Sequence, residues 1–366
     1  MGGIFLGLKP SGYQLACLQH ATDGRGASSS SRMSAGSWCI PTDMNSSITR
    51  RRFLGSASIA AAGALAGCYS PERSDILVRS HSSATSGAKV PYRISLAEWS
   101  YHKALFGRGS SKMDHLDFPV VARRTHGIDG IELVNQFMMK QATDQNYLRE
   151  FKRRADGEGV RCVLIMCDDE GYLGDPDTAK RNQAVSNHHK WADAARFFGC
   201  HSIRVNAATK DVGSFEEQQK RAADGLSHLG NYCAKLGLNC IVENHGGLSS
   251  NGQWLSGVMR LVNKPNVGTL PDFGNFSLGN GATYDRYKGV EEMMPFAKAV
   301  SAKSYDFDAA GNCIETDYDR MMAIVLRHGY HNWVGIEYEG EHLSEVEGIR
   351  KTQRLLERIR NQYAQG

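Results

Sequence analysis

The sequence predicts an α/β protein with a single domain, a (β/α)8 TIM barrel over residues 91–366, behind an N-terminal leader. Two observations favour this fold. Eight short apolar runs alternate with amphipathic stretches, and their combined length suits one barrel of roughly 250 residues. In addition, no Gly-x-Gly-x-x-Gly motif opens the first helix, which disfavours the alternative of an open, doubly wound sheet that binds a dinucleotide.

The eight apolar runs are the expected strands. Several are continuously apolar, as is typical of parallel strands that are covered on both faces. The expected strands are residues 93–99, 130–134, 161–167, 202–206, 239–244, 267–272, 297–304 and 334–338.

Between these runs, apolar residues recur at a spacing of three to four, which predicts helices. The clearest pattern is 145–157, with Tyr147, Leu148, Phe151 and Ala155 on one face. The other expected helices are residues 177–198, 215–236, 318–328 and 344–363. Several end just before a glycine that suits a left-handed C-cap, namely Gly159, Gly199, Gly237 and Gly329.

The leader resembles an export signal. Three arginines and Phe53-Leu54 directly precede an Ala-rich run at 57–66, and Leu65-Ala66-Gly67-Cys68 follows. This pattern resembles a twin-arginine signal peptide over 44–68 that ends in a lipoprotein cleavage box, and the apolar run is too short to span a membrane. It implies a periplasmic protein anchored by lipid at Cys68, with a soluble exported form as the alternative.

Two flanking segments complete the leader. Residues 69–90 are rich in Ser and are expected to form a flexible linker. Residues 1–43 show no periodicity, and Met44 is a better start for a signal peptide, so we interpret them as an upstream extension.

Charge and cysteine usage argue against two classes of function, although neutral overall charge leaves a local basic patch open. The net charge is +4, but residues 1–68 hold six basic and two acidic residues, so the remainder is neutral. A neutral body lacks the basic face that nucleic-acid binding requires. The six cysteines beyond Cys68 form no Cys-x-x-Cys pair, which disfavours a zinc knuckle; we expect buried free thiols, with a disulfide as the alternative.

Carboxylates follow three of the expected strands. Glu243, Asp272 and Glu337 lie at the ends of the fifth, sixth and eighth strands, and the C-terminal ends of barrel strands build the active site. Three acids this close repel one another unless a cation holds them. An oxygen-rich ligand set suits Mn²⁺ or Mg²⁺, with Zn²⁺ or Co²⁺ as alternatives.

Four motifs resemble a known family. Val-Glu-Asn-His-Gly-Gly at 242–247, Pro-Asp-Phe-Gly-Asn at 271–275, Ala-Lys-Ser-Tyr-Asp-Phe-Asp at 302–308 and Gly-Ile-Glu-Tyr-Glu-Gly at 335–340 are similar to the xylose-isomerase-like TIM barrel superfamily, in particular its sugar phosphate isomerase/epimerase branch. The resemblance implies a divalent ion held by Glu, Asp, His and Glu.

Three of these four ligands match this sequence, and the fourth does not. Glu243, Asp272 and Glu337 are the implied metal ligands, whereas Ser301 stands where the family has His. Serine is a poor ligand, so the ion is expected to be held more weakly, with water completing its coordination, or to be lost. His245 is an alternative fourth ligand.

The resemblance also implies a reaction. Glu243 and Glu337 would be the catalytic residues, one removing a proton beside a carbonyl and the other returning it, through an enediolate stabilised by the metal. Further residues at strand ends are implied or expected to contact the substrate. For Glu132 and Arg204 the alternative is a buried ion pair. His245 could instead have a structural role, and Trp99 could instead pack in the core. The expected substrate-binding residues are Glu132, Arg204, Asn206, His245, Asn275, Lys303, Trp99 and His102.

The function expected from the sequence is therefore that of a metal-dependent sugar or sugar phosphate isomerase or epimerase. One alternative is a lyase, dehydratase or oxidoreductase-partner step on a keto-sugar in the same barrel. Another is a sugar-binding lipoprotein that has lost its metal. The expected partner is a small sugar and not a nucleic acid, and a homo-oligomer is left open.

Overall fold

Eight parallel strands form a barrel in the computed structural model, which describes residues 90–108 and 112–364. The predicted signal peptide, Cys68 and nearly all of the linker lie outside the described residues. The barrel strands are β1 (Arg93–Ala97), β2 (Gly130–Val134), β3 (Arg161–Met166), β4 (Ser202–Asn206), β5 (Asn239–Glu243), β6 (Val267–Leu270), β9 (Val300–Ser304) and β10 (Trp333–Tyr338).

The strands are ordered around the barrel as they are in the chain. β1 to β6 pair with their sequence neighbours, and β10 lies between β1 and β9. Parallel bridges from Thr269 to Ala297 and from Asp272 to Ser301 join β6 to the β9 side and close the ring. This order has no reversal point, so the predicted closed barrel is confirmed and the doubly wound alternative is excluded.

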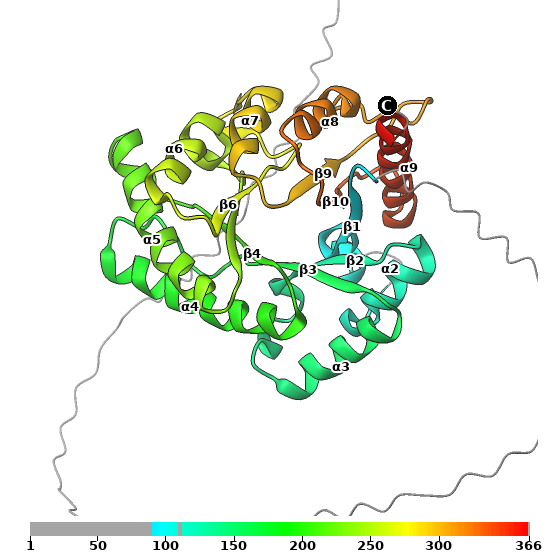
Figure 1. Ribbon diagram of the computed structural model, residues 1–366, viewed down its shortest axis with the longest axis horizontal. Helices are drawn as coiled ribbons and strands as arrows, with labels where there is room; N and C mark the ends of the chain where they lie inside the picture. Colours follow the sequence, from blue (N-terminus) through cyan, green and yellow to red (C-terminus); the bar gives the residue numbers. More distant parts are fainter. Residues whose placement is uncertain (1–89, 109–111, 365–366) are drawn as a thin grey trace, which may run out of the picture. The chain divides into compact units, whose positions relative to one another are not determined.

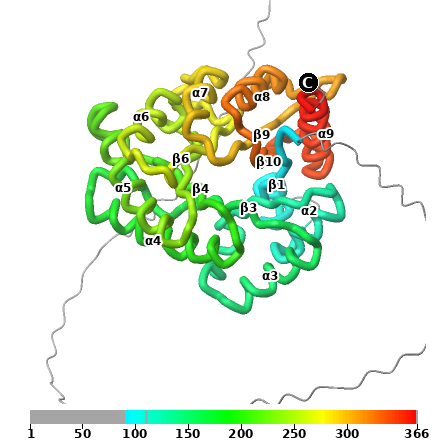
Figure 2. Tube along the Cα trace, viewed as in Figure 1, coloured from blue at the N-terminus to red at the C-terminus, as the bar shows by residue number. Residues whose placement is uncertain are grey.

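Helices surround the strands (Figure 1). The trace in Figure 2 passes around the ring in chain order, so that the red C-terminal helix returns to the cyan N-terminal strand, where the Tyr92 hydroxyl donates to the Leu356 carbonyl at 2.6 Å. The helices are α1 (His102–Leu105), α2 (Phe118–His126), α3 (Gln145–Gly157), α4 (Thr178–Phe198), α5 (Phe215–Lys235), α6 (Gly252–Val262), α7 (Arg286–Met293), α8 (Tyr318–Arg327) and α9 (Glu345–Ala364).

Short polar side chains determine where most of these helices begin. Asp144 accepts hydrogen bonds from the first backbone N–H groups of α3, and Asp177 does the same for α4. At α5, Ser214 and Glu217 form a reciprocal capping box. At the other end of α4, Gly199 adopts the left-handed conformation predicted for it, with φ of 80°.

The sequence predicted all eight barrel strands and five helices, but some boundaries were wrong. The first strand ends at Ala97, and Glu98–Tyr101 forms a 3₁₀ helix. The sixth ends at Leu270, before Pro271, which has no N–H to donate. The prediction missed α1, α2, α6 and α7, and also a small hairpin of β7 (Ser277–Gly279) and β8 (Ala282–Thr283).

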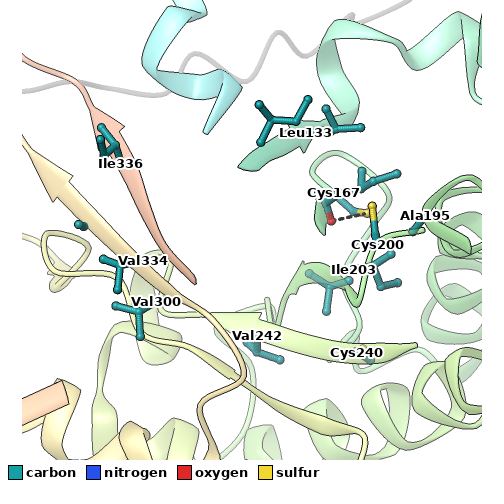
Figure 3. Close-up of a cluster of buried hydrophobic side chains, with 14 of the residues drawn as sticks. Leu133, Cys167, Ala195, Cys200, Ile203, Cys240, Val242, Val300, Val334 and Ile336 are labelled. Atoms are coloured by element: carbon teal, nitrogen blue, oxygen red, sulfur yellow. Dashed lines mark hydrogen bonds between the residues drawn. The ribbon is translucent and has the colours of Figure 1, made fainter. Parts of the chain in front are cut away.

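Two apolar layers hold the barrel together. The outer layer packs the outward faces of the strands against the helices, with Leu133, Ile203, Val242 and Ile336 in it (Figure 3). All six described cysteines are buried and unpaired, as expected for free thiols. Within the described part of the chain, no helix has the length and apolar character needed to span a membrane.

The inner layer fills the barrel itself. It contains Leu164, Ile241, Leu270 and Trp333, which are all buried. A Cβ atom on Gly130 would collide with the Trp333 ring, so only glycine fits opposite this tryptophan. The barrel is therefore a packed core, and its open end is the mouth at the C-terminal ends of the strands.

Candidate metal and sugar site

Three buried carboxylates meet at the barrel mouth. Glu243 is the last residue of β5, Asp272 follows β6, and Glu337 lies near the end of β10. Each offers an oxygen, and these oxygens all lie within 4.8 Å of one another. Over residues 90–108 and 112–364, this is the one group of acidic, His or Cys side chains with such an arrangement, and His245 is not part of it.

Ser301 lies beside two of these acids. Its hydroxyl oxygen is 2.6 Å from Oδ2 of Asp272 and 3.1 Å from Oε2 of Glu337. A serine hydroxyl carries one hydrogen and can donate to only one of them at a time. The position where the resemblance implied a His thus holds a neutral hydroxyl that bridges two of the three candidate metal ligands.

Two basic side chains flank the acids. Nε of Arg204 is 2.6 Å from Oε2 of Glu243, and its Nη1 is 2.8 Å from Oδ1 of Asp168. On the other side, Nζ of Lys303 is 3.0 Å from Oε1 of Glu337.

Lys303 also contacts a further acid, Glu339, at 3.3 Å. Together with Asp168 and the three central acids, Glu339 brings the mouth to five carboxylates against two cations. When all five are ionised, the mouth carries an excess of three negative charges, most of which a divalent cation would offset.

Burial changes how the central acids titrate. Burial raises the pKa of Glu243 to about 7; Arg204 opposes this rise and Glu337 adds to it. Burial likewise raises the pKa of Asp272 to about 7, and Lys303 opposes the rise. Burial disfavours the charged amine of Lys303, but Asp272 and Glu337 outweigh it and hold the pKa of Lys303 well above its ordinary value. Near neutral pH, the two acids therefore exchange protons readily while the lysine stays charged.

Asn275 connects several of these groups. Its amide nitrogen donates to Oε1 of Glu243 at 2.8 Å, and its amide oxygen accepts from Nζ of Lys303 at 3.0 Å. Its backbone N–H and that of Gly274 both donate to Oδ1 of Asp272 at 2.8 Å. A single loop after β6 therefore orients one carboxylate by its backbone and another by its side chain.

An aromatic wall borders the acids on the β1 side. The indole N–H of Trp99 donates to Oε1 of Glu339. The His102 ring stacks on Trp99 with centroids 5.2 Å apart, and its Nδ1 lies 2.8 Å from the Trp99 carbonyl oxygen. Phe106 and Phe137 each lie 6.1 Å from Trp99, between ring centroids.

The remaining predicted site residues occupy different depths. Asn206 is partly buried and donates to Asp168 at 2.8 Å. His245 is exposed, and its backbone N–H donates to Ser249. Glu132 is fully buried and accepts a hydrogen bond from Ser95, whereas the ion-pair partners of Arg204 are Asp168 and Glu243. Arg204 therefore forms the buried ion pair that was the alternative for it, with Glu243 and Asp168 as partners, whereas Glu132 is not paired with Arg204.

Sequence reasoning missed Phe106, Phe137 and Ser95. Phe106 and Phe137 lie in loops after the first two strands, where a position relative to the mouth cannot be assigned from periodicity. Ser95 lies two residues before Ala97 on the same strand, and residues two apart on a strand face the same side. This was the one sequence signal that Ser95 faces the barrel interior.

Comparisons with known proteins agree with this architecture. A structure of L-ribulose 3-epimerase superposes with a TM-score of 0.60 at 13% identity, over 75% of this chain and 96% of that one. An apo structure of 3-keto-D-glucoside 4-epimerase from E. coli gives 0.57 at 13% identity, over 73% and 99%. A xylose isomerase-like TIM barrel protein from Mycobacterium smegmatis in complex with magnesium gives 0.56 at 16% identity, over 74% and 97%.

At these identities, the likeness to solved structures shows the fold alone. The curated proteins gave no significant match. The family model for xylose isomerase-like TIM barrels, however, matches residues 121–359, which is more than half of the sequence. The chain therefore belongs to the xylose isomerase-like TIM barrel family.

Proposed function

We propose that the protein is a metal-dependent isomerase or epimerase of a sugar or sugar phosphate. The observation that carries this proposal is the convergence of Glu243, Asp272 and Glu337 at the C-terminal mouth of a barrel of this family. The excess negative charge and the oxygen-only donor set suit a divalent cation, Mn²⁺ or Mg²⁺ before Zn²⁺ or Co²⁺. Ser301 adds a weak neutral oxygen in place of an imidazole.

Glu243 and Glu337 are the proposed proton carriers. Around the ring, β6 and β9 separate their strands, so the two acids approach a bound sugar from different sides. One acid, in its ionised form, takes the proton beside the carbonyl, and the other, in its protonated form, delivers a proton to the neighbouring carbon or to the opposite face. A bound divalent ion would polarise the carbonyl and stabilise the negative charge of the enediolate.

The surroundings of each acid suit this work. Without a cation the pKa of Glu243 is near 7, and a bound cation would lower it and keep Glu243 in the ionised form that a base needs. Arg204 fixes its orientation, while Ser301 and Lys303 fix that of Glu337. Lys303 is also close enough to the acids to stabilise a developing oxyanion.

The rim of the mouth offers the proposed sugar contacts. Trp99 presents an aromatic face on which a sugar ring can stack, and His102 supports it. Exposed His245 and partly buried Asn206 are available to bind hydroxyl groups. Asn275 already bridges Glu243 and Lys303, so we assign it to orienting these groups as well as to the substrate.

Ser301 favours one second candidate, a sugar-binding protein that lacks the metal. In that case the Lys303 ammonium, 3.0 Å from Glu337, would provide the charge that an ion provides in relatives. A lyase or dehydratase would begin with the same proton abstraction and would differ by losing a hydroxyl group, so its product distinguishes it.

We also propose that the N-terminal region directs export by the twin-arginine route and lipid attachment at Cys68. The Arg50-Arg51-Arg52-Phe53-Leu54 sequence before the Ala-rich run supports this. Because that route carries folded proteins, the metal would be acquired before export.

Metal analysis combined with a keto-sugar isomerisation screen tests the proposal. We expect about one divalent ion per chain in the purified protein, and loss of both the ion and turnover in Glu243→Gln. Glu216→Gln, which changes an exposed acid on α5, is the matched control and should keep both. A metal-free wild type with unchanged sugar binding would favour the sugar-binding alternative.

A further inference from the structure

A buried acid lies below the mouth, outside the candidate metal ligands. Glu132 is fully enclosed in the barrel. Its Oε1 accepts a hydrogen bond from the Ser95 hydroxyl at 2.6 Å, whereas its Oε2 has no hydrogen-bond partner among the residues that the structure describes. A buried carboxylate with one unpartnered oxygen is costly, which favours the neutral acid form.

The barrel leaves room for this carboxyl group at Gly335. A Cβ atom on Gly335 would lie 2.5 Å from both carboxyl oxygens of Glu132, so the acid occupies the space that any side chain there would need. Gly335 precedes Glu337 by two residues on β10, and alternate residues of a strand face the same side. Glu132 thus lies one layer below Glu337, about 7 Å along the strand.

The charges around Glu132 disfavour its ionisation. Burial is the main reason that its pKa rises to about 8; the Ser95 hydrogen bond opposes the rise, and Glu337 and Glu243 add to it. Arg204 on β4 lowers the pKa by a smaller amount. Tyr330, which is buried near β10, is neutral and contributes no charge.

We propose that Glu132 is a positioning residue for the acid cluster: a neutral carboxylic acid one layer below the mouth that keeps a further negative charge away from Glu243 and Glu337. This inference deepens the proposed function and rests on it. As long as Glu132 is protonated, it adds no like charge to the acids above it. When it ionises, the added charge strengthens their hold on protons and attracts a divalent cation.

The effect of a bound cation on the protonation of Glu132 can be measured. A cation bound to the three carboxylates above must lower the proton affinity of Glu132, so cation affinity must rise with pH until Glu132 is ionised in the free protein. Glu243 and Asp272, whose pKa values are about 7, still release protons between pH 7 and 8, so the part that belongs to Glu132 is the difference between the wild type and Glu132→Gln. The release of one proton limits that difference to about tenfold per pH unit.

The test measures Mg²⁺ affinity by calorimetry from pH 6 to 9.5 in the full chain and two variants. In the wild type, affinity should rise through pH 8 and level off above it. Glu132→Gln keeps the size of the side chain and should level off at a lower pH than the wild type. Ser95→Ala removes the hydrogen bond that lowers the pKa of Glu132, so it should level off at a higher pH than the wild type. A role in packing alone would not move the plateaus in opposite directions.

An infrared titration of the metal-free protein provides a second readout. The wild type should show a protonated carboxyl band that disappears near pH 8, and Glu132→Gln should lack it. Identical bands, or identical plateaus in wild type and Glu132→Gln, would overturn the assignment. A wild type that binds no Mg²⁺ would contradict the proposed function instead, and the infrared titration would then decide whether Glu132 is the neutral acid.

Discussion

The contribution of Glu132 to the stability of the protein should fall as pH rises from about 4.5 to 8, and Glu132→Gln should remove this fall. The pKa of Glu132 is raised from 4.5 to about 8 by burial. The folded state therefore keeps a proton that the unfolded state has released in this pH range. Stability falls with pH wherever the folded state binds more protons, so this contribution is fully present below pH 4.5 and is lost by pH 8.

The size of the effect follows from the same shift. Each tenfold change in proton affinity is worth about 1.4 kcal/mol, so the wild type loses about 5 kcal/mol through Glu132 between pH 4.5 and 8. The glutamine variant lacks this loss but buries an amide whose N–H groups lack partners, at about 1–3 kcal/mol. We therefore expect Glu132→Gln to be more stable by about 2–4 kcal/mol at pH 8 and less stable at pH 4.

Urea denaturation from pH 4 to 9 measures this difference, and the control is Glu216→Gln, whose curve should follow the wild type. The decisive quantity is the pH dependence of the difference between wild type and Glu132→Gln. A difference that stays constant across this range would refute the reasoning, because it would mean that Glu132 titrates alike in the folded and unfolded protein.

Three further predictions concern the metal and export. Replacing Ser301 with His should tighten Mn²⁺ binding about tenfold or more, because an imidazole replaces a weak ligand; unchanged affinity in calorimetry would show that residue 301 does not face the ion. The pKa values near 7 of Glu243 and Asp272 mean that a cation must displace protons below pH 7, so affinity should fall on acidification and binding should release protons into weak buffers. If the heat of cation binding were the same in buffers of different ionisation enthalpy, no protons would be released and the prediction would be wrong. Changing Arg50 and Arg51 to Lys should retain the protein in the cytoplasm, and cell fractionation that finds it exported would reject the proposed signal.

The barrel was predictable because its signals are local. Each strand is a short apolar run, and each run had to be covered on both sides. The boundary errors arose from contacts beyond the local sequence. The first strand ends before Glu98, whose carboxylate accepts a hydrogen bond from the backbone N–H of Val134 at 2.6 Å. The missed helix α2 contains Pro119 and three basic residues in nine positions, which obscured its apolar face.

The convergence of the acids was also predictable, but their partners were not. Parallel strands end at one edge, so Glu243, Asp272 and Glu337 had to approach one another although they are far apart in the chain. Whether Arg204 binds Glu132 or Glu243 depends on the depth that each side chain reaches inside the barrel. Periodicity assigns a residue to a face and does not give that depth. The surroundings of Glu132 could therefore be found only from the structure.

The barrel closes beside the candidate site, where β6 meets β9, and this seam between the two strands affects local unfolding. Only isolated bridges join β6 to the β9 side, and Pro271 supplies a carbonyl there but no amide. Amide hydrogens of the seam, such as those of Ser301 and Phe273, should therefore exchange with solvent sooner than those of the continuous ladder between β4 and β5. A ligand that bridges Asp272 and Glu337 would hold the two sides of the seam together. Ligand binding at the mouth should therefore slow amide hydrogen exchange along the seam more than in the other strands of the barrel.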